Sequence, residues 1–162
     1  MSYNTEKISK ERWDYSWKKG KEVEEKFKKI VSDRGNIINK SSKEEDIYQH
    51  IDFWVNNKGV DVKGSRHLEC IWLELKNVNG DKGWLQGESE WIVFDVEELS
   101  SFCVFKRIDL LNYILSTVKE TTESKKDFLK YYTRKKWNRK DVLVKCRYYD
   151  IEHLLIQKLN YK

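Results

Sequence analysis

The stretch from 50 to 64, HIDFWVNNKGVDVKG, carries two aspartates and a lysine in a pattern typical of a β-hairpin. A two-residue turn over 56–57 would place Asp52 directly opposite Asp61, and a turn one residue later would place it opposite Lys63. In either register the three polar side chains share one face, while the intervening valines point to the other face, into a core. Opposed residues have Cβ atoms about 4.5–5.5 Å apart, so two carboxylates there repel each other unless a cation lies between them. The spacing therefore predicts a divalent-cation site, and the alternative is a solvated hairpin face.

A third carboxylate is predicted to reach the hairpin from a helix over 8–33, which the sequence indicates is broken near Gly20. The apolar residues follow helical spacing, and Glu24 lies next to the inward face that Phe27 and Val31 define. Mg²⁺ is usually held by one or two carboxylates together with waters and phosphate oxygens. Glu24 is therefore a candidate ligand, and the alternative is an ordinary residue at the edge of a buried face.

The other elements predict an α/β or α+β fold in which a mixed sheet is flanked by helices. Alternating or continuous apolar runs predict strands, and amphipathic spacing predicts helices. The predicted strands are 48–55, 59–64, 69–77, 90–94, 102–106 and 141–146, and the further predicted helices are 107–118, 125–137 and 150–159. The length of 162 residues fits a single domain over 1–162.

Charge and composition exclude several classes of protein. Residues 50–118 contain seven basic and eleven acidic residues, whereas residues 119–162 contain thirteen basic and six acidic residues. The basic C-terminal part therefore favours an acidic partner. The three cysteines, Cys70, Cys103 and Cys146, form no Cys-x-x-Cys pair, which argues against zinc and for buried thiols of an intracellular protein. The polar N-terminus and the lack of a long apolar run argue against secretion and against a membrane span.

Ten basic residues fall within 125–147, KKDFLKYYTRKKWNRKDVLVKCR, with only two acidic residues among them. Cations bind phosphates without regard to sequence, and the interleaved aromatic residues can stack on unpaired bases. The predicted nucleic-acid contacts are Lys130, Arg134, Lys135, Lys136, Trp137, Arg139 and Lys140. The alternative is a solvated helix whose aromatic side chains face the core.

Taken together, these residues resemble the PD-(D/E)xK nuclease superfamily, and within it the small endonuclease-like proteins of viruses and phages. Asp52 matches the family's first aspartate, and DVK over 61–63 matches its acidic-x-Lys triplet. GKEVEEKF over 20–27 is similar to the family's helix, with Glu24 as its glutamate. The stretch IWLELKNVNGDKGWLQGESEWIVF over 71–94 is similar to the Gly-Trp-containing continuation of the viral proteins.

The resemblance covers a catalytic core over 20–106 and leaves 119–162 as a basic extension of helices and strands. It implies a restriction-endonuclease-like fold and the hydrolysis of phosphodiester bonds in DNA, in the cytoplasm or nucleoid of a host cell. It also implies Mg²⁺ or Mn²⁺ held by Asp52 and Asp61 with the helical glutamate nearby, where the metal activates a water. Lys63 would orient the nucleophile or neutralise developing charge.

Several alternatives stay open at this point. ELK over 74–76 is a second acidic-x-Lys triplet, for which Asp61 would be the lead aspartate, and Glu74 is in either case a candidate metal ligand. Trp84 in the following loop is a candidate substrate contact. A nuclease-like fold could bind nucleic acid without cleaving it, or its basic face could bind an acidic protein. A homodimer would suit double-strand cleavage, which needs two active sites.

Overall fold

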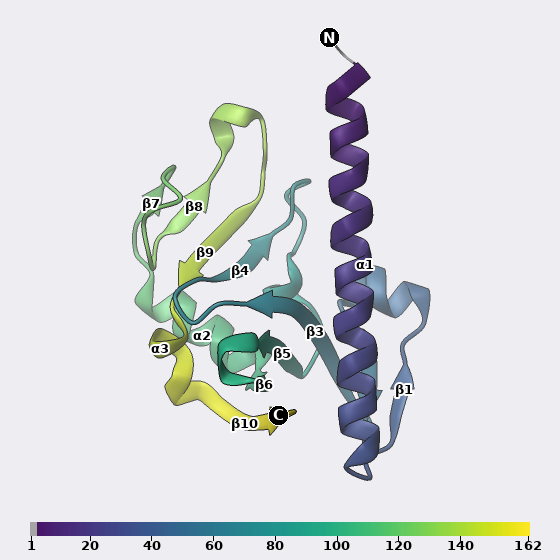
Figure 1. The fold of residues 1–162 in the computed structure, drawn as a ribbon. Coiled ribbons are helices and arrows are strands. Elements are labelled where there is room, and N and C mark those ends of the chain that lie inside the picture. Colours follow the sequence, from purple (N-terminus) through teal and green to yellow (C-terminus); the bar gives the residue numbers. More distant parts are fainter. Residues whose placement is uncertain (1–2) are drawn as a thin grey trace.

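The computed structural model describes residues 3–162, with side chains from residue 10 onward except at residue 65. It has a mixed α+β architecture, in which the long helix α1 (Tyr3–Asp33) packs against the larger of two β-sheets (Figure 1). The predicted break near Gly20 is wrong, because α1 runs through this residue without interruption. A glycine inside a helix costs only about 1 kcal/mol relative to alanine, which the packing of the following turns can offset.

The larger sheet has six strands in the order β1-β2-β3-β5-β6-β10. Their bounds are β1 (Ile38–Lys40), β2 (Phe53–Val55), β3 (Lys58–Arg66), β5 (Trp91–Val96), β6 (Ser101–Lys106) and β10 (Leu155–Asn160). The central pair β3 and β5 is parallel, and every other neighbouring pair is antiparallel. The sheet is therefore mixed, as the sequence predicts.

The smaller sheet has four strands in the order β4-β9-β8-β7. Their bounds are β4 (Ile71–Lys76), β9 (Val142–Cys146), β8 (Tyr131–Thr133) and β7 (Thr121–Thr122). β9 pairs antiparallel with both β4 and β8, so a strand near the C-terminus holds this sheet together. Figure 1 shows the smaller sheet on the side of the molecule away from α1.

Short helices and helical turns connect the strands. The α-helices are α2 (Arg107–Thr117) and α3 (Tyr148–Ile151), η1 (Glu45–Gln49) is a π-helical turn, and the 3₁₀ turns are η2 (Trp84–Gln86), η3 (Glu97–Leu99), η4 (Lys135–Trp137) and η5 (Glu152–Leu154). None of the described helices is both long enough and apolar enough to cross a membrane.

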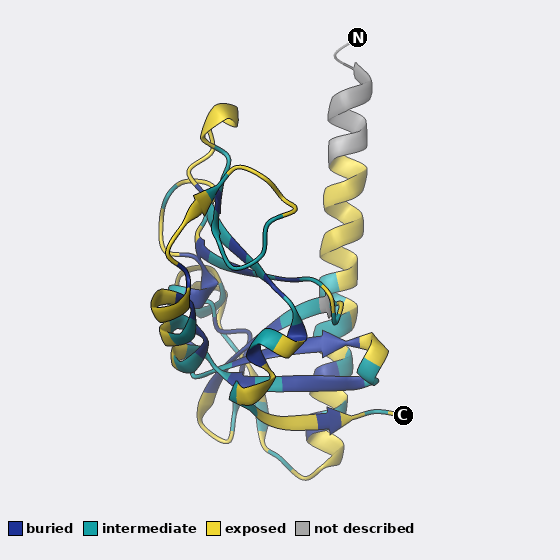
Figure 2. Cartoon of the chain, turned by 90° about the vertical axis from the view of Figure 1, so that its left-hand side faces the viewer, coloured by how far each residue is buried: buried dark blue, intermediate teal, exposed yellow. Residues whose placement is uncertain are grey.

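The apolar core lies on both faces of the larger sheet. On one face Phe27 and Val31 of α1 pack with Val60, Val62 and other strand residues. On the other face a larger cluster joins β5 and β6 to η2, α2 and the inner face of the smaller sheet. Figure 2 shows buried residues concentrated along the central strands and an exposed stretch along the upper part of α1. The position of the valines confirms the predicted alternation along β3.

Three predicted elements are wrong. The predicted strand over 48–55 is a π-helical turn followed by the short β2. The predicted helix over 125–137 contains β8, whose Tyr131–Thr133 backbone pairs with β9. The predicted helix over 150–159 is helical only as far as the end of η5, and from Leu155 the chain forms β10, which pairs with the edge of β6. For β8 and β10, hydrogen bonds to residues distant in sequence outweigh the local pattern, because tertiary context overrides weak propensities.

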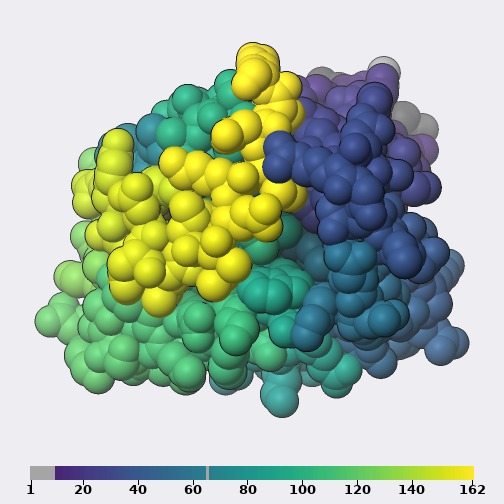
Figure 3. All heavy atoms as spheres, turned by 90° about the horizontal axis from the view of Figure 1, so that it is seen from below, coloured from purple at the N-terminus to yellow at the C-terminus, as the bar shows by residue number. Residues whose placement is uncertain are grey.

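The C-terminal strand closes against the end of the first helix. Viewed from below, β10 lies beside the segment that follows α1 (Figure 3). The guanidinium Nη2 of Arg34 donates a hydrogen bond of 2.8 Å to the carbonyl of Asn160. Tyr161 donates a hydrogen bond of 2.7 Å to Asp95, and Lys26 of α1 lies 3.4 Å from the centroid of the Tyr161 ring. The C-terminal part of α1 and the end of the chain after β10 are therefore tied together.

Candidate functional site

A tight hairpin sets the register of the two central aspartates. Residues 56–57 both adopt positive φ, 49° and 67°, and Phe53 pairs with Val60. The turn predicted over 56–57 is therefore confirmed, and two asparagines suit it because asparagine tolerates positive φ better than most residues. Continuing this register by one pair brings Asp52 level with Asp61.

Asp52 lies just before β2 begins, at the uncovered edge of β3. Its backbone N–H donates to the carbonyl of Val60 at 2.8 Å, and its carboxylate Oδ2 accepts a hydrogen bond from the N–H of Val62 at 2.7 Å. The side chain thus takes the place of a strand partner where β2 stops. His50, with a left-handed φ of 56°, ends the π-helical turn and directs the chain into this position. The carboxyl group is buried as a result, with 7% of Asp52 exposed.

Asp61 and Lys63 form a buried ion pair beside Asp52. Asp61 is 2% exposed, and its Oδ1 lies 2.9 Å from the Lys63 ammonium. Its second oxygen, Oδ2, is buried and accepts no hydrogen bond from any described residue. A buried carboxylate oxygen without a partner is costly, so this atom is the clearest indication in the site of a ligand-binding position.

Burial and charge repulsion act together on Asp52. Burial is the main cause that raises the pKa of its carboxyl group to about 8, and the nearby negative charge of Asp61 raises it further. The Val62 N–H and the Lys63 ammonium oppose this change because both stabilise the ionised form. At neutral pH the carboxyl group therefore retains its proton unless positive charge is added beside it.

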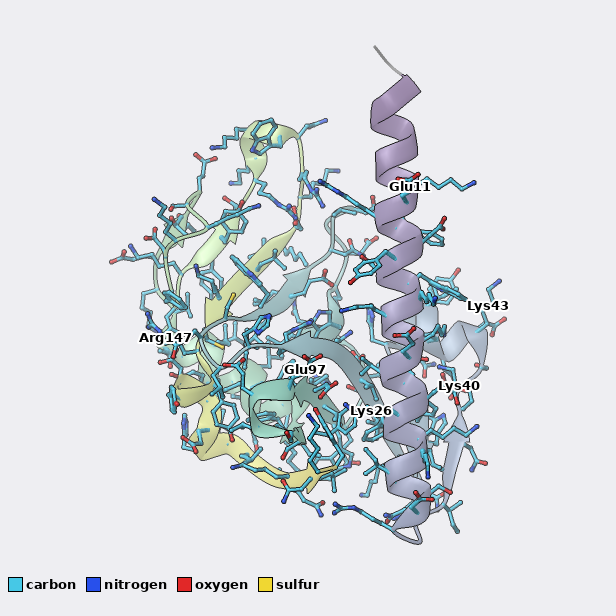
Figure 4. The ribbon with its side chains drawn as sticks, viewed as in Figure 1. Glu11, Lys26, Lys40, Lys43, Glu97 and Arg147 are labelled. Carbon is cyan, nitrogen blue, oxygen red and sulfur yellow. The ribbon has the colours of Figure 1, made fainter. Side chains whose placement is uncertain are left out.

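Glu24 reaches this region from α1. Its Oε2 lies 3.2 Å from the ammonium of Lys21 and 3.3 Å from that of Lys40 on β1. The charge of Glu24 contributes to the raised pKa of Asp52, so the two carboxyl groups are electrostatic neighbours. Figure 4 shows Lys40 beside α1, where its ammonium also lies 4.8 Å from the centroid of the Phe53 ring. Glu24 thus acts on Asp52 through its charge, while its carboxylate pairs with two lysines on the α1 side of the sheet.

Glu74 belongs to the other sheet and interacts with the site indirectly. Its Oε1 accepts a weak hydrogen bond, 3.4 Å long, from the N–H of Trp84 at the start of η2. Gly83 packs so closely on Glu74 that a Cβ atom there would lie 2.7 Å from the Glu74 carbonyl oxygen. The indole ring of Trp84 in turn lies 4.8 Å from the Lys63 ammonium. Glu74 therefore supports the residue that contacts Lys63, and Lys76 of the same triplet is exposed.

The predicted nucleic-acid-binding residues lie in a hairpin rather than a helix. The basic tip, residues 134–140 between β8 and β9, is exposed from residue 135 onward, and Trp137 is 68% exposed. At its base the buried Asp141 pairs with Arg134 and Arg139. Outside the tip, the Lys130 ammonium lies 3.4 Å from a Glu120 carboxylate oxygen. The charges that face solvent are thus mostly lysines of the tip.

The basic tip approaches the loop that leads to Trp84. The N–H of Lys140 donates a 3.4 Å hydrogen bond to the carbonyl of Val78, and Gly80 packs against the Lys140 side chain. Trp84 follows this loop and carries the ring beside Lys63. The segment from Val78 to Trp84 therefore contacts the basic tip at one end and Lys63, beside the two aspartates, at the other.

Three side chains around the aspartates, Lys21, Lys40 and Arg66, are not predicted from the sequence. Lys21 is one helical turn from Glu24, a spacing that indicates a contact, whereas Lys40 reaches Glu24 only through the pairing of β1 with β2. Trp84 is predicted as a candidate substrate contact, but its position beside Lys63 is not predicted. Arg66, at the end of β3, has its pKa lowered mainly by burial and raised in part by the charge of Asp61.

Other candidate ligands lie apart from this site. Among the residues described, no three His, Cys, Asp or Glu side chains converge as a metal-binding group, so the aspartate pair is the core of the candidate site. All three cysteines are free, and burial raises the pKa of Cys103 to about 11 and that of Cys146 to about 12. Thiols with such pKa values are poor nucleophiles at neutral pH.

Comparison with known proteins gives no relative: no family model, curated protein or solved structure matches the chain.

Proposed function

We propose that the chain is a metal-dependent endonuclease that hydrolyses phosphodiester bonds in DNA, with a restriction-endonuclease-like core of the PD-(D/E)xK type. The observation that carries the proposal is the buried pair Asp52 and Asp61, in which burial and the charge of Asp61 disfavour ionisation of Asp52, with the Lys63 ammonium 2.9 Å from Asp61. A divalent cation would favour ionisation of both carboxyl groups, and a neighbouring lysine suits a phosphate substrate.

The two aspartates fit a hard divalent cation such as Mg²⁺ or Mn²⁺. Asp61 offers a buried Oδ2 that no described residue uses, and Asp52 offers a carboxyl group that gains from added positive charge. Both are oxygen donors, which these cations prefer, and sites of one or two carboxylates are common where phosphate and water complete the shell. When bound, the cation would supply Lewis acidity and a water of lowered pKa.

The remaining residues have roles that follow from their contacts. Lys63 is held between Asp61 and the Trp84 ring, so its ammonium is positioned to orient a water or to neutralise charge on a phosphate oxygen. Glu24 is a further candidate ligand, because its charge contributes to the raised pKa of Asp52. Glu74 fits a supporting role better than a ligand role, because its contact is with the Trp84 backbone.

The basic tip is the proposed contact for the nucleic-acid backbone. Lys135, Lys136 and Lys140 are exposed there beside Trp137, whereas Arg134 and Arg139 pair with Asp141. Exposed lysines release counterions when they bind phosphates, so affinity should fall steeply with salt. Intracellular location and a homodimer remain predictions from the sequence and from the two-site requirement of double-strand cleavage.

A catalytically inactive nucleic-acid-binding protein of the same fold is the second candidate. One observation favours it, which is that no third metal-binding side chain converges on the aspartates among the described residues. That protein would bind nucleic acid and leave it intact with any divalent cation.

The test is cleavage of plasmid, single-stranded and branched DNA by purified protein with Mg²⁺ or Mn²⁺. Wild type should cut at least one substrate, while Asp61→Ala and Lys63→Ala should lose activity. Glu74→Gln is the matched control, because it changes a nearby carboxylate that we place outside the metal site. Equal cleavage by wild type and both site variants would contradict the assignment, and binding without any cleavage would support the second candidate.

A further inference from the structure

The α1 arm, residues 10–19, exposes large aromatic side chains that the rest of the described structure does not cover. Every residue of the arm is exposed, and the exposed fractions are 66% for Trp13, 62% for Tyr15 and 57% for Trp17. Figures 1 and 2 show this part of α1 rising above the larger sheet and standing apart from the smaller sheet. Exposed tryptophans close together are informative, because clustered apolar surface commonly marks a binding site.

The two tryptophans lie on the stripe of α1 that leads to the candidate site. At 100° per residue, Trp13 and Trp17 lie within about 20° of Glu24, one on each side, whereas Tyr15 lies on the opposite face. Lys21 links them, since its ammonium lies 5.7 Å from the centroid of the Trp17 ring and 3.2 Å from Glu24 Oε2. The tryptophan stripe therefore continues through Lys21 to Glu24, whose charge acts on Asp52.

The charge of the arm favours a polyanion. Residues 10–21 contain five basic side chains, Lys10, Arg12, Lys18, Lys19 and Lys21, against two acidic ones, Glu11 and Asp14. Cations bind the backbone of a nucleic acid, and aromatic side chains bind the faces of its bases. This is the combination by which proteins hold single strands with little regard to sequence.

The spacing of the tryptophans selects between paired and unpaired bases. Four residues of helix rise about 6 Å, whereas stacked bases in a duplex repeat every 3.4 Å or so and cover each other's faces. Only bases that have left the stack can present their faces to both indole rings. We propose that Trp13 and Trp17 form a stacking surface for unpaired bases, so that the substrate delivered to the Asp52–Asp61 site is single-stranded nucleic acid.

As far as it concerns a substrate, this inference rests on the proposed nuclease function, so binding and cleavage are tested separately. The probe is a labelled single-stranded DNA oligonucleotide, compared with the same sequence annealed to its complement, and EDTA prevents cleavage while anisotropy reports binding. Stacking contributes at least about fivefold per base to affinity. The double variant Trp13→Ala/Trp17→Ala should therefore lose about 25-fold or more for the single strand and little for the duplex.

Tyr15→Ala is the matched control, because Tyr15 belongs to the same arm and has similar exposure but lies on the opposite face. It should bind the single strand like wild type. Circular dichroism checks that both variants keep their helix content, which alanine favours. Equal losses in the control and the double variant, or equal losses for single strand and duplex, would overturn the stacking surface.

Cleavage with Mn²⁺ separates the two proposals. If wild type cuts DNA and the double variant binds and cuts single strands equally well, the inference fails and the nuclease function stands. If wild type cuts nothing but binds single strands through the tryptophans, the nuclease function fails and the stacking surface stands. A change in sedimentation on removing the tryptophans, with binding unchanged, would overturn the inference in favour of a contact between two copies of the chain.

Discussion

Replacing Asp52 by asparagine should stabilise the protein increasingly as pH rises. Asparagine has almost the same shape, and its amide oxygen can still accept the hydrogen bond from the Val62 N–H that the carboxylate Oδ2 accepts now. It removes the group whose pKa rises from an ordinary value of 3.8 to about 8 on folding. The substitution therefore removes a proton linkage while it keeps the packing.

The sign follows from which state binds the proton more tightly. The folded protein keeps the Asp52 proton up to about pH 8, whereas the unfolded chain loses it near pH 3.8. The stabilisation that the protonated group provides is complete below pH 3.8 and is lost as pH rises toward 8. Between these values the free energy of unfolding falls by about 1.4 kcal/mol per pH unit from this group, hence by roughly 3 kcal/mol between pH 5 and pH 7.

The assay is urea unfolding in EDTA, followed by circular dichroism at several pH values from 5 to 8. The gap between Asp52→Asn and wild type should widen by roughly 3 kcal/mol from pH 5 to pH 7. Asp81→Asn changes an exposed carboxylate and should keep a constant gap. A gap for Asp52→Asn that stays constant over the same range would refute the reasoning about burial and repulsion.

Three further outcomes follow from the contacts described. Excess Mg²⁺ or Mn²⁺ should raise the melting temperature of wild type, and a concentration of a hundred times the dissociation constant should stabilise the folded state by about 2.7 kcal/mol. Asp61→Asn should lose this effect, whereas Glu74→Gln should keep it. Gly83→Ala should lower the free energy of unfolding in urea by about 1–3 kcal/mol, because the added Cβ atom would meet the Glu74 backbone. Gly20→Ala, which has open space around it, should stabilise α1 by up to about 1 kcal/mol. Equal effects of the two substitutions would contradict the close packing at Gly83. Asp141→Ala should cost about 1–3 kcal/mol, mainly because the half-buried Arg134 loses its partner, and a neutral result in the same assay would show that the pair contributes nothing.

The sequence is a good guide to the hairpin because its information there is local. The asparagines of residues 56–57 favour the turn, and the alternation of Val60 and Val62 with Asp61 and Lys63 fixes which side chains share a face. The half-buried position of Glu24 at the edge of the packed face of α1 likewise follows from helical periodicity. These predictions need only neighbours within a few residues.

The rest of the site depends on contacts between distant segments. Lys40 meets Glu24 because β1 pairs with β2, and the Trp84 ring meets Lys63 because η2 packs between the two sheets. Similarly, 150–159 has the apolar spacing of a helix, but the open edge of β6 supplies backbone partners that make β10 a strand. The burial that raises the pKa of Asp52 also arises only when all these parts assemble.

The contacts between the C-terminal segment and α1 affect how the protein folds during its synthesis. β4 pairs with β9 about seventy residues later, and β10 completes a sheet that begins with β1. Contacts so far apart in sequence close slowly, and they cannot form until the last residues have left the ribosome. The basic extension is therefore part of the folding unit, and trimming it from the C-terminus would leave the edges of both sheets open to aggregation.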